Sequence, residues 1–197
     1  QLQEEFNEMI ESVDTYGGFY IGRYETGNLA SNTTTEPVVV KGNESISNVN
    51  WYYMYENSKK IAANNNVVST MIWGSLWDRT LIWLEETGEK TYAELYDSRT
   101  WGNYNDSTGA AEANSGSRKA TGFSEAWKAN NIYDLAGNVY ERTIEALNTN
   151  GRVNRGGSYD YSGSNNPASY RNSIGSPSNT GISYGTRPAL YVALDTE

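Results

Sequence analysis

Residues 155–191 read RGGSYDYSGSNNPASYRNSIGSPSNTGISYGTRPALY, and this stretch decides how the rest of the chain is interpreted. Inside its flanking segments it carries two charged side chains, Asp160 and Arg171, and two aliphatic side chains larger than Ala, Ile174 and Ile182. So polar a run cannot bury enough apolar surface to fold by itself. Its composition alone therefore favours a disordered linker.

Both ends of the stretch favour a different interpretation, because they predict β-strands. RVNRGGSY begins at Arg152 and GTRPALYVAL begins at Gly185; their apolar residues alternate or run together, and glycines supply turns. A segment whose two ends are fixed by β-strands is a held loop, which means a loop of defined position and not a disordered linker. Tyrosines among Ser, Asn and Gly are typical of binding loops, because Tyr offers a large contact area at low entropic cost. The tyrosines are Tyr159, Tyr161, Tyr170 and Tyr184.

Three motifs carry a resemblance to a known family. They are NIYDLAGNVYERT at 131–143, RVNRGGSY at 152–159 and YGTRPAL at 184–190. They resemble the C-terminal half of the formylglycine-generating-enzyme (sulfatase-modifying factor) family, whose usual pattern is N-x-x-D-x-x-G-N-V-W-E-W, R-G-G-S-W and G-F-R. The resemblance implies an α+β, C-type-lectin-like fold of that family's subtype, with much irregular structure.

A narrower resemblance concerns SGSNNPASYR at 162–171, PSNT at 177–180 and RPALY at 187–191. These segments resemble the variable proteins of diversity-generating retroelements, which occur in bacteria and their phages. In those proteins adenine-directed mutagenesis rewrites Asn-type codons near the C-terminus, and the altered side chains form the ligand-binding face.

This resemblance implies a variable region at about residues 155–191. Thr186 stands where the family pattern has Phe, which fits a rewritten codon. The residues expected to shape the loop are Gly156, Gly157, Pro167, Arg171, Pro177 and Arg187. The residues expected to bind the ligand are Tyr159, Asp160, Tyr161, Asn165, Asn166, Tyr170, Asn172, Ser173, Ile174, Gly181, Ile182, Ser183, Tyr184 and Thr186.

The copper chemistry of the formylglycine-generating-enzyme family is not expected in this chain. Its aerobic enzymes bind copper through two cysteines that follow the GGS-aromatic motif. Counted from Ser158, these positions fall on Tyr161 and Asn166, and neither residue can supply a thiolate. Oxidase activity of that type is therefore not expected.

The composition sets wider limits. The chain has 197 residues, a net charge of −9 and a mean hydropathy of −0.70, which predict one domain with its own core and no membrane insertion. Its 24 carboxylates against 15 Lys and Arg disfavour nucleic acid as a partner. Cys and His are absent from the sequence, so we expect no copper, zinc or haem, no disulfides and no Ser-His-Asp triad.

Residues 131–143 contain the candidate metal site. Asp134 and Glu141 offer hard oxygens, and the backbone carbonyls of Gly137 and Val139 could complete a calcium shell without nitrogen or sulfur ligands. The resembling family holds a structural calcium at these four positions, so the resemblance implies calcium as a cofactor. The alternative is that Asp134 caps a turn and Glu141 is a surface or buried-pair carboxylate.

The chain is divided into two parts. Residues 1–16 have helical apolar spacing and are interpreted as an N-terminal helix for docking or homo-oligomerisation. Residues 17–197 form the lectin-like ligand-binding domain. Residues 1–13 contain several acidic side chains and no apolar core of a signal peptide.

Further elements are expected to form scaffold. The strongest helix is predicted at residues 69–86, where Trp73 and Trp77 share a stripe with leucines and are assigned to the core. Another helix is expected at about residues 56–64. Glu25 is interpreted as a strand-end carboxylate with a structural hydrogen bond.

A long excursion at residues 100–121 has little periodicity, which is typical of a binding loop or a flexible one. Its polar side chains Asn103, Asn105 and Asp106 could hold a cation, although turn formation is the simpler interpretation.

We therefore predict a non-enzymatic protein of phage or bacterial origin, which binds a protein or glycan on a target cell from a phage tail tip or a bacterial surface. One alternative is a carboxylate-based hydrolase such as a glycosidase, which would pair Asp134 with Glu141 or Glu25. The other alternative is an inert structural subunit of a virion or cell surface. Against the hydrolase, the C-terminal loop contains a single carboxylate, Asp160.

Overall fold

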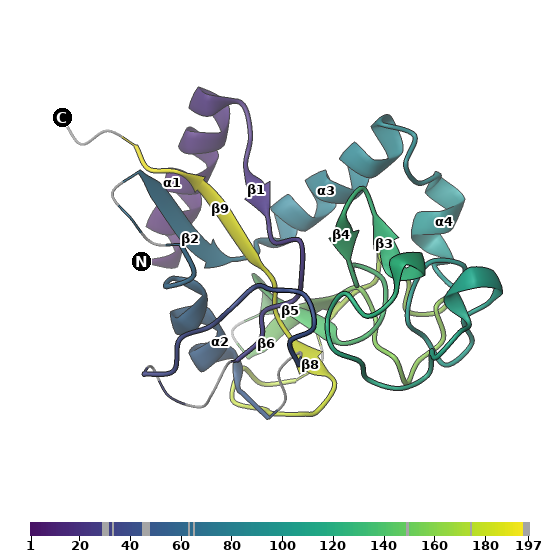
Figure 1. Cartoon of the computed structure of the whole chain (residues 1–197). Coiled ribbons are helices and arrows are strands. Elements are labelled where there is room, and N and C mark those ends of the chain that lie inside the picture. The colour runs from purple at the N-terminus through teal and green to yellow at the C-terminus, as the bar shows by residue number, and fades with distance from the viewer. Residues whose placement is uncertain are drawn as a thin grey trace.

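The computed structural model describes residues 1–28, 32, 34–44, 48–62, 64, 66–148, 150–173 and 175–194. Within this part of the chain, small β-sheets and short helices are joined by long irregular segments (Figure 1). The helices are α1 (Leu2–Tyr16), α2 (Trp51–Ser58), α3 (Gly74–Glu86) and α4 (Tyr92–Tyr96), with 3-10 turns η1 (Gly109–Ala111) and η2 (Glu125–Trp127). The strands are β1 (Tyr20–Ile21), β2 (Val67–Met71), β3 (Lys128–Ala129), β4 (Ile132–Tyr133), β5 (Tyr140–Asn148), β6 (Gly151–Arg155), β7 (Arg171–Ser173), β8 (Tyr184–Gly185) and β9 (Pro188–Val192).

One sheet joins the two ends of the chain. Its strand order is β1-β9-β2, all antiparallel, so the C-terminal strand lies between two strands from the first half of the sequence. Helix α1 packs beside this sheet (Figure 1), where Ser12 donates a hydrogen bond from Oγ to the Val192 carbonyl at 2.7 Å. Met9 on the same helix is fully buried. The helix ends at Gly17, whose φ of 80° favours glycine.

A second sheet carries the C-terminal region, in the order β7-β6-β5-β8. Strands β5, β6 and β7 are antiparallel neighbours, and β8 pairs with β5 in parallel. Arg155 on β6 donates to the Gly74 carbonyl at the start of α3, so its side of the sheet faces that helix. Because side chains alternate along a strand, Asn154 points to the opposite face.

The prediction of a helix from residue 69 was wrong at its start. Residues 67–71 form β2, and α3 begins only at Gly74. Val67, Val68 and Thr70 are β-branched and pair with β9, a partner that lies more than a hundred residues away in sequence. The core assignment of Trp73 and Trp77 is confirmed, because both are buried in the main hydrophobic cluster.

The second predicted helix was displaced along the chain. Helix α2 spans Trp51–Ser58 and not residues 56–64, because Asn50 caps it by accepting a hydrogen bond from the Tyr53 backbone N–H at 3.1 Å. The aromatic residues from Trp51 to Tyr55 therefore lie within the helix. Tyr55 stacks on Trp51 with the ring centroids 5.0 Å apart.

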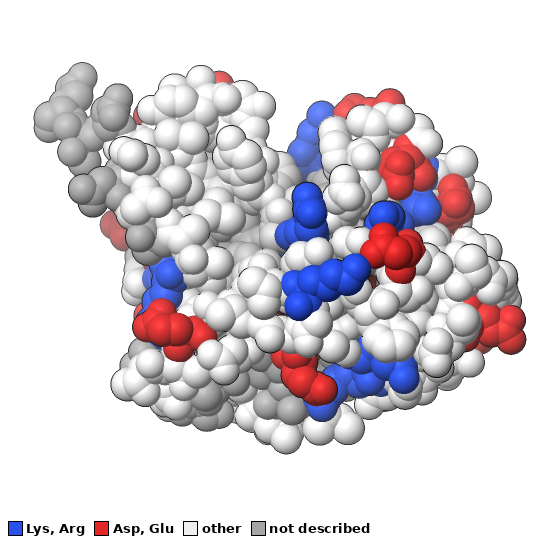
Figure 2. All heavy atoms as spheres, in the orientation of Figure 1, with Lys and Arg blue, Asp and Glu red and all other residues white. Residues whose placement is uncertain are grey.

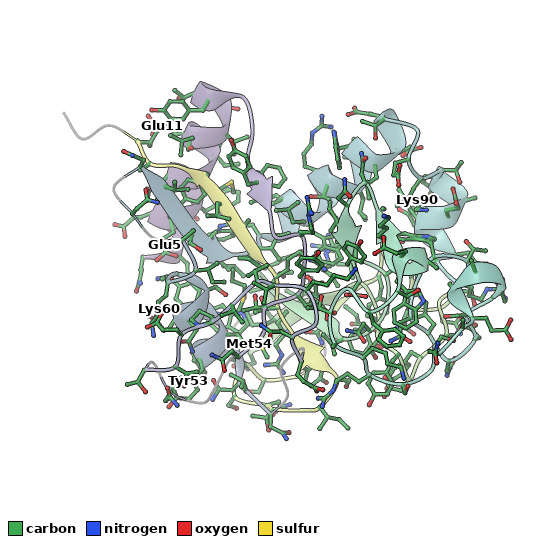
Figure 3. The ribbon with its side chains drawn as sticks, in the orientation of Figure 1. Glu5, Glu11, Tyr53, Met54, Lys60 and Lys90 are labelled. Carbon is green, nitrogen blue, oxygen red and sulfur yellow. The ribbon has the colours of Figure 1, made fainter. Side chains whose placement is uncertain are left out.

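Helix α1 is also tied to α2. Glu5 lies on the side of α1 near α2 (Figure 3). Its carboxylate accepts hydrogen bonds from the Tyr55 hydroxyl at 2.6 and 2.7 Å and from Lys59 Nζ at 2.9 Å. The role of α1 in docking or oligomerisation stays a prediction. No helix in the described ranges is both long and apolar enough to cross a membrane.

The charged side chains are mixed in sign. On the face seen in Figure 2, Lys and Arg lie beside Asp and Glu and do not form one continuous basic area. An example is Glu125, which pairs with both Lys41 and Lys128 at 2.9 and 2.7 Å. Such exposed pairs contribute little to stability.

Candidate ligand-binding surface

The C-terminal loop leaves β6 through a pair of glycines. Gly156 and Gly157 have φ angles of 81° and 76°, a region that other residues rarely adopt. A side chain at Gly157 would also overlap the Asn166 carbonyl. The turn is then fixed by a hydrogen bond of 3.0 Å from the Tyr159 backbone N–H to the Asn138 carbonyl.

The first half of the loop is fastened to the excursion at residues 100–121. The Asn105 side chain donates to the Asp160 carbonyl at 2.9 Å. Both carboxylate oxygens of Asp106 accept hydrogen bonds, one from the Ser162 hydroxyl at 2.7 Å and one from the Gly163 backbone N–H at 2.8 Å. The polar side chains Asn105 and Asp106 of the excursion therefore hold the C-terminal loop in place by hydrogen bonds.

The second half of the loop is hydrogen-bonded to the start of α2, to Asn48 and to Arg118. The Trp51 backbone N–H at the start of α2 donates to the Pro177 carbonyl at 3.0 Å, and the Asn48 backbone N–H donates to the Gly181 carbonyl at 3.1 Å. The Arg118 guanidinium donates to the carbonyl of residue 182 at 3.2 Å. The described parts of the loop are thus hydrogen-bonded to the rest of the domain.

Four tyrosines gather where the loop crosses the second sheet. Tyr140 on β5 lies at the centre, with ring centroids of Tyr161, Tyr170 and Tyr184 at 5.5, 5.7 and 6.2 Å. Tyr140 is buried, Tyr161 is 48% exposed, and Tyr170 and Tyr184 are half-buried. We call these four residues the tyrosine cluster. It combines a packed centre with rings that reach solvent, which is the form of an aromatic contact surface.

The predicted ligand-binding residues divide by exposure. Those exposed to solvent are Asp160, Tyr161, Asn165, Asn172 and Ile182. Those half-buried are Tyr159, Tyr170, Gly181, Ser183 and Tyr184. The side chain of Ser173 and all of Ile174 lie outside the described residues.

Two predicted ligand-binding residues do not reach the surface. Thr186 is fully buried, because its hydroxyl donates to the Arg142 carbonyl at 3.1 Å and its own carbonyl accepts from the Thr26 backbone N–H at 2.9 Å. Asn166 is also buried, and its carbonyl lies so close to Gly157 that a Cβ at that glycine would overlap it. We therefore reassign Thr186 and Asn166 from ligand binding to structural roles. Of the expected loop-shaping residues, Arg171 is instead half exposed and binds Glu145.

Beneath the tyrosine cluster lies a set of polar side chains that the sequence analysis missed. They occupy the sheet face turned away from α3, where Arg142 on β5 pairs with Asn154 on β6 and Asn154 pairs with Asn172 on β7. Arg142 and Asn154 are each 1% exposed. The signal in the sequence was the alternation of polar side chains inside predicted strands, which is unusual for a buried position.

Arg142 lies directly under Tyr184. Its guanidinium carbon is 4.5 Å from the ring centroid, and its Nη1 is 3.5 Å from the Pro177 carbonyl oxygen. Gly181 leaves room for the ring, since a Cβ there would lie 2.9 Å from it. Burial lowers the pKa of Arg142, so its positive charge is costly in this position.

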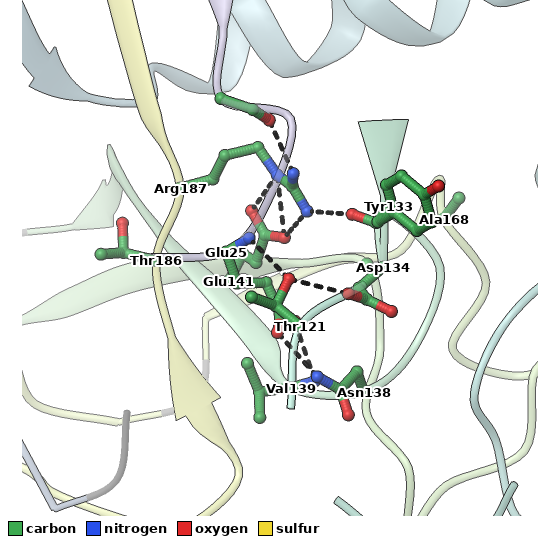
Figure 4. Close-up of polar contacts among 12 residues, drawn as sticks. Glu25, Thr121, Tyr133, Asp134, Asn138, Val139, Glu141, Ala168, Thr186 and Arg187 are labelled. Carbon is green, nitrogen blue, oxygen red and sulfur yellow. Dashed lines mark hydrogen bonds and ion pairs between the residues drawn. The ribbon is translucent and has the colours of Figure 1, made fainter. Parts of the chain in front are cut away.

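The opposite face of β5 carries a buried ion pair (Figure 4). Arg187 binds the Glu141 carboxylate with nitrogen to oxygen distances of 2.6 to 3.0 Å, and also donates to the carbonyls of Gly22 and Tyr133 at 2.7 Å. Burial acts to lower the pKa of Arg187, but the charge of Glu141 and its hydrogen bonds outweigh burial and raise that pKa. The pair ties β9 to β1, β4 and β5, and so supports the sheet below the loop.

The predicted calcium ligands fit this arrangement poorly. Both oxygens of Glu141 accept from Arg187. Asp134 uses one oxygen to accept from the Thr121 hydroxyl at 2.8 Å and the Gly122 backbone N–H at 2.7 Å, which leaves its Oδ1 without a partner among the described residues. No group of three or more carboxylates that could hold a metal ion occurs in the described ranges. Calcium stays a prediction, and we assign no role to it.

Glu25 takes the structural role that was expected. It is fully buried and accepts from the Asn138 side chain at 2.7 Å and from the Val139 backbone N–H at 3.3 Å. Glu25 lies beyond β1, which ends at Ile21, and not at a strand end. Asn138 in turn accepts from the Asn103 side chain at 3.0 Å, so these residues link the segment after β1 to the excursion and to the turn before β5. Figure 4 shows Glu25 beside Asn138 and Val139.

Comparison with known proteins identifies the fold. No protein-family model matches the chain, and no curated protein matches it in sequence. Among solved structures, Treponema denticola variable protein 1 aligns over 87% of this chain and 84% of its own, with a TM-score of 0.52 and 18% identity. PvdO from Pseudomonas aeruginosa aligns over 89% and 80%, with a TM-score of 0.57 and 15% identity. The chain shares their fold.

A further match is the U1 variant of Major Tropism Determinant, which aligns over 90% of this chain and 51% of its own, with a TM-score of 0.50 and 13% identity. The predicted α+β, C-type-lectin-like fold with much irregular structure is therefore confirmed. These structures have the fold that the motif resemblance implied.

Proposed function

We propose that this protein is a non-enzymatic ligand-binding protein, which recognises its target through the tyrosine cluster and the exposed side chains around it. The observation that carries the proposal is the contrast between a firmly hydrogen-bonded loop backbone and exposed side chains such as Tyr161, Asn172 and Ile182. A preformed surface of this kind binds without a large cost of ordering. Two structural relatives, named as a variable protein and as a tropism determinant, support the same role.

The hydrolase alternative is less well supported. It requires two carboxyl groups that face one cleft. Glu25, Asp134 and Glu141 are at most 1% exposed, and Glu25 and Glu141 are held by internal hydrogen bonds or an ion pair. Asp160 on the loop is exposed, and its carboxylate accepts a hydrogen bond of 2.6 Å from the Ser158 hydroxyl.

We further propose that the surface is diversified by a retroelement and displayed on a phage tail tip or a bacterial cell, toward a protein or glycan of a target cell. Sequencing of sibling genes tests this proposal. We expect substitutions to be confined to adenine-containing codons of exposed residues, such as Asp160, Tyr161, Asn165 and Asn172, while Arg142 and Asn154 stay unchanged. Substitutions spread evenly along the gene would favour an inert structural subunit.

A further inference from the structure

Unpartnered hydrogen-bond donors lie along the sheet face that carries the tyrosine cluster, and Tyr140 belongs to both groups. Among the described residues, the Tyr140 hydroxyl, Arg142 Nε, Arg152 Nε and Asn154 Nδ2 are buried atoms without a hydrogen-bond partner. All four belong to β5 or β6, and the contacts of Arg142 and Arg152 place them on the face turned away from α3. We call these four residues the donor floor.

The donor floor is positively charged and has no counter-charge among the described residues. Arg142 lies under Tyr184, and Arg152 lies with its guanidinium carbon 4.4 Å from the Trp51 ring centroid. Neither arginine takes part in any of the ion pairs found in the described part of the chain, although other arginines of the domain do. A buried charge without a counter-charge, such as that of Arg142, is costly. Perturbed charges of this kind are found more often at functional sites than elsewhere.

All four groups donate and therefore select an acceptor. Burial raises the pKa of the Tyr140 hydroxyl, so it remains a neutral donor at physiological pH. Guanidinium, amide and phenol donors together match a carboxylate, which accepts several hydrogen bonds and neutralises the charge. Tyr184 lies over Arg142, so its half-buried ring must move before a ligand reaches the guanidinium.

We propose that the donor floor binds a carboxylate of the target, and that this carboxylate is an Asp or Glu side chain on a protein. The inference rests on the proposed function and names the chemistry of its ligand. A protein is favoured over an acidic glycan because the surface above the floor is built from tyrosines with Ser and Asn, the side chains that cover protein epitopes. The whole chain carries more acidic than basic side chains and so repels an acidic ligand. A preference for a carboxylate must therefore come from the donor floor itself.

Nuclear magnetic resonance of the arginine Nε–H groups tests the inference directly in the whole chain. The probes are the blocked peptide Gly-Glu-Gly, its Gln analogue, glucuronate and glucose, all at matched ionic strength. We expect saturable shifts of Arg142 and Arg152 with the Glu peptide, at least about tenfold weaker binding of the Gln peptide, and no shift of Arg79 on α3. Arg142→Gln should abolish the response at Arg152, and Arg79→Gln should not change it.

Three results would overturn the inference. Shifts with glucuronate but not with the Glu peptide would assign the floor to acidic sugars. Equal binding of the Glu and Gln peptides would remove the role of charge. The absence of any shift in the wild-type chain would show that the floor is closed, whether or not Arg142→Gln folds. None of these results depends on the binding of a target by the tyrosines, so the proposed function is judged separately.

Discussion

Tyr184 covers the guanidinium of Arg142, with the ring centroid 4.5 Å from the guanidinium carbon. The contact joins the half-buried Tyr184 on β8 to the buried Arg142 on β5, and so links the tyrosine cluster to the scaffold. It also shields a charge that has no carboxylate partner among the described residues. The surface residues and the sheet beneath them therefore depend on each other.

Removal of this ring should be measurable in stability. We expect Tyr184→Ala to lower the free energy of unfolding by about 1–2 kcal/mol, because a cation–π contact and part of a buried ring are lost. Tyr16→Ala, at the exposed last residue of α1, should change it by less than about 0.5 kcal/mol. Urea unfolding of both variants gives the comparison, and equal effects would mean that the ring is not packed on Arg142.

The glycine turn after β6 should tolerate no side chain. Gly157→Ala places a methyl group against the Asn166 carbonyl in a backbone region that disfavours Ala, and we expect a loss of about 2–4 kcal/mol. Gly42→Ala is the matched control, since Gly42 has a φ of 84° but nothing within 4 Å of the added carbon. It should cost only the backbone strain, about 1 kcal/mol. Similar thermal unfolding of the two variants would contradict the close approach.

The buried ion pair below the loop should be sensitive to the loss of one partner. Glu141→Gln removes the ion-pair partner of the fully buried Arg187, and we expect a loss of about 3–5 kcal/mol. Glu86→Gln removes a partner of Arg79 in an exposed pair and should cost less than about 1 kcal/mol. Denaturant unfolding at neutral pH measures both. A mild effect of Glu141→Gln would indicate that Arg187 is held by backbone carbonyls alone.

Calcium removal tests the remaining metal prediction. Because both oxygens of Glu141 accept from Arg187, we expect the melting temperature of the protein to be the same in millimolar calcium and in a chelator. Asp134→Asn should then show the same indifference. A melting temperature that rises with calcium in the wild type and not in Asp134→Asn would establish the site that the family resemblance implies.

Much of the fold could be predicted from the sequence, because short motifs fix local turns and strand ends. The RVNRGGSY and GTRPALYVAL segments correctly indicated β6 and β9, and the leucine and tryptophan stripe indicated α3, while the short strand β8 was not predicted. The start of that helix was misjudged, since β2 is defined by its pairing with β9 and not by its own periodicity. Local pattern does not contain such long-range pairing.

The surface was predicted less completely than the fold. The strands predicted at both ends correctly indicated a held loop, but exposure at single positions depends on the packing around them. Thr186 was expected to face a ligand, yet it is buried by contacts with Arg142 and Thr26. Tyr140 was read only as part of a motif, and its central place in the tyrosine cluster follows from residues 20 to 45 positions away.

The account stands on the tyrosine cluster as the contact surface, and a glycan and protein array tests it most directly. The wild-type chain is compared with a double variant, Tyr161→Ala and Tyr184→Ala, and with a control that replaces two exposed tyrosines elsewhere, Tyr20→Ala and Tyr92→Ala. We expect the first variant to lose at least about tenfold in binding to every array target that the wild type recognises, while the control keeps its binding. Equal binding by the two variants would contradict the account.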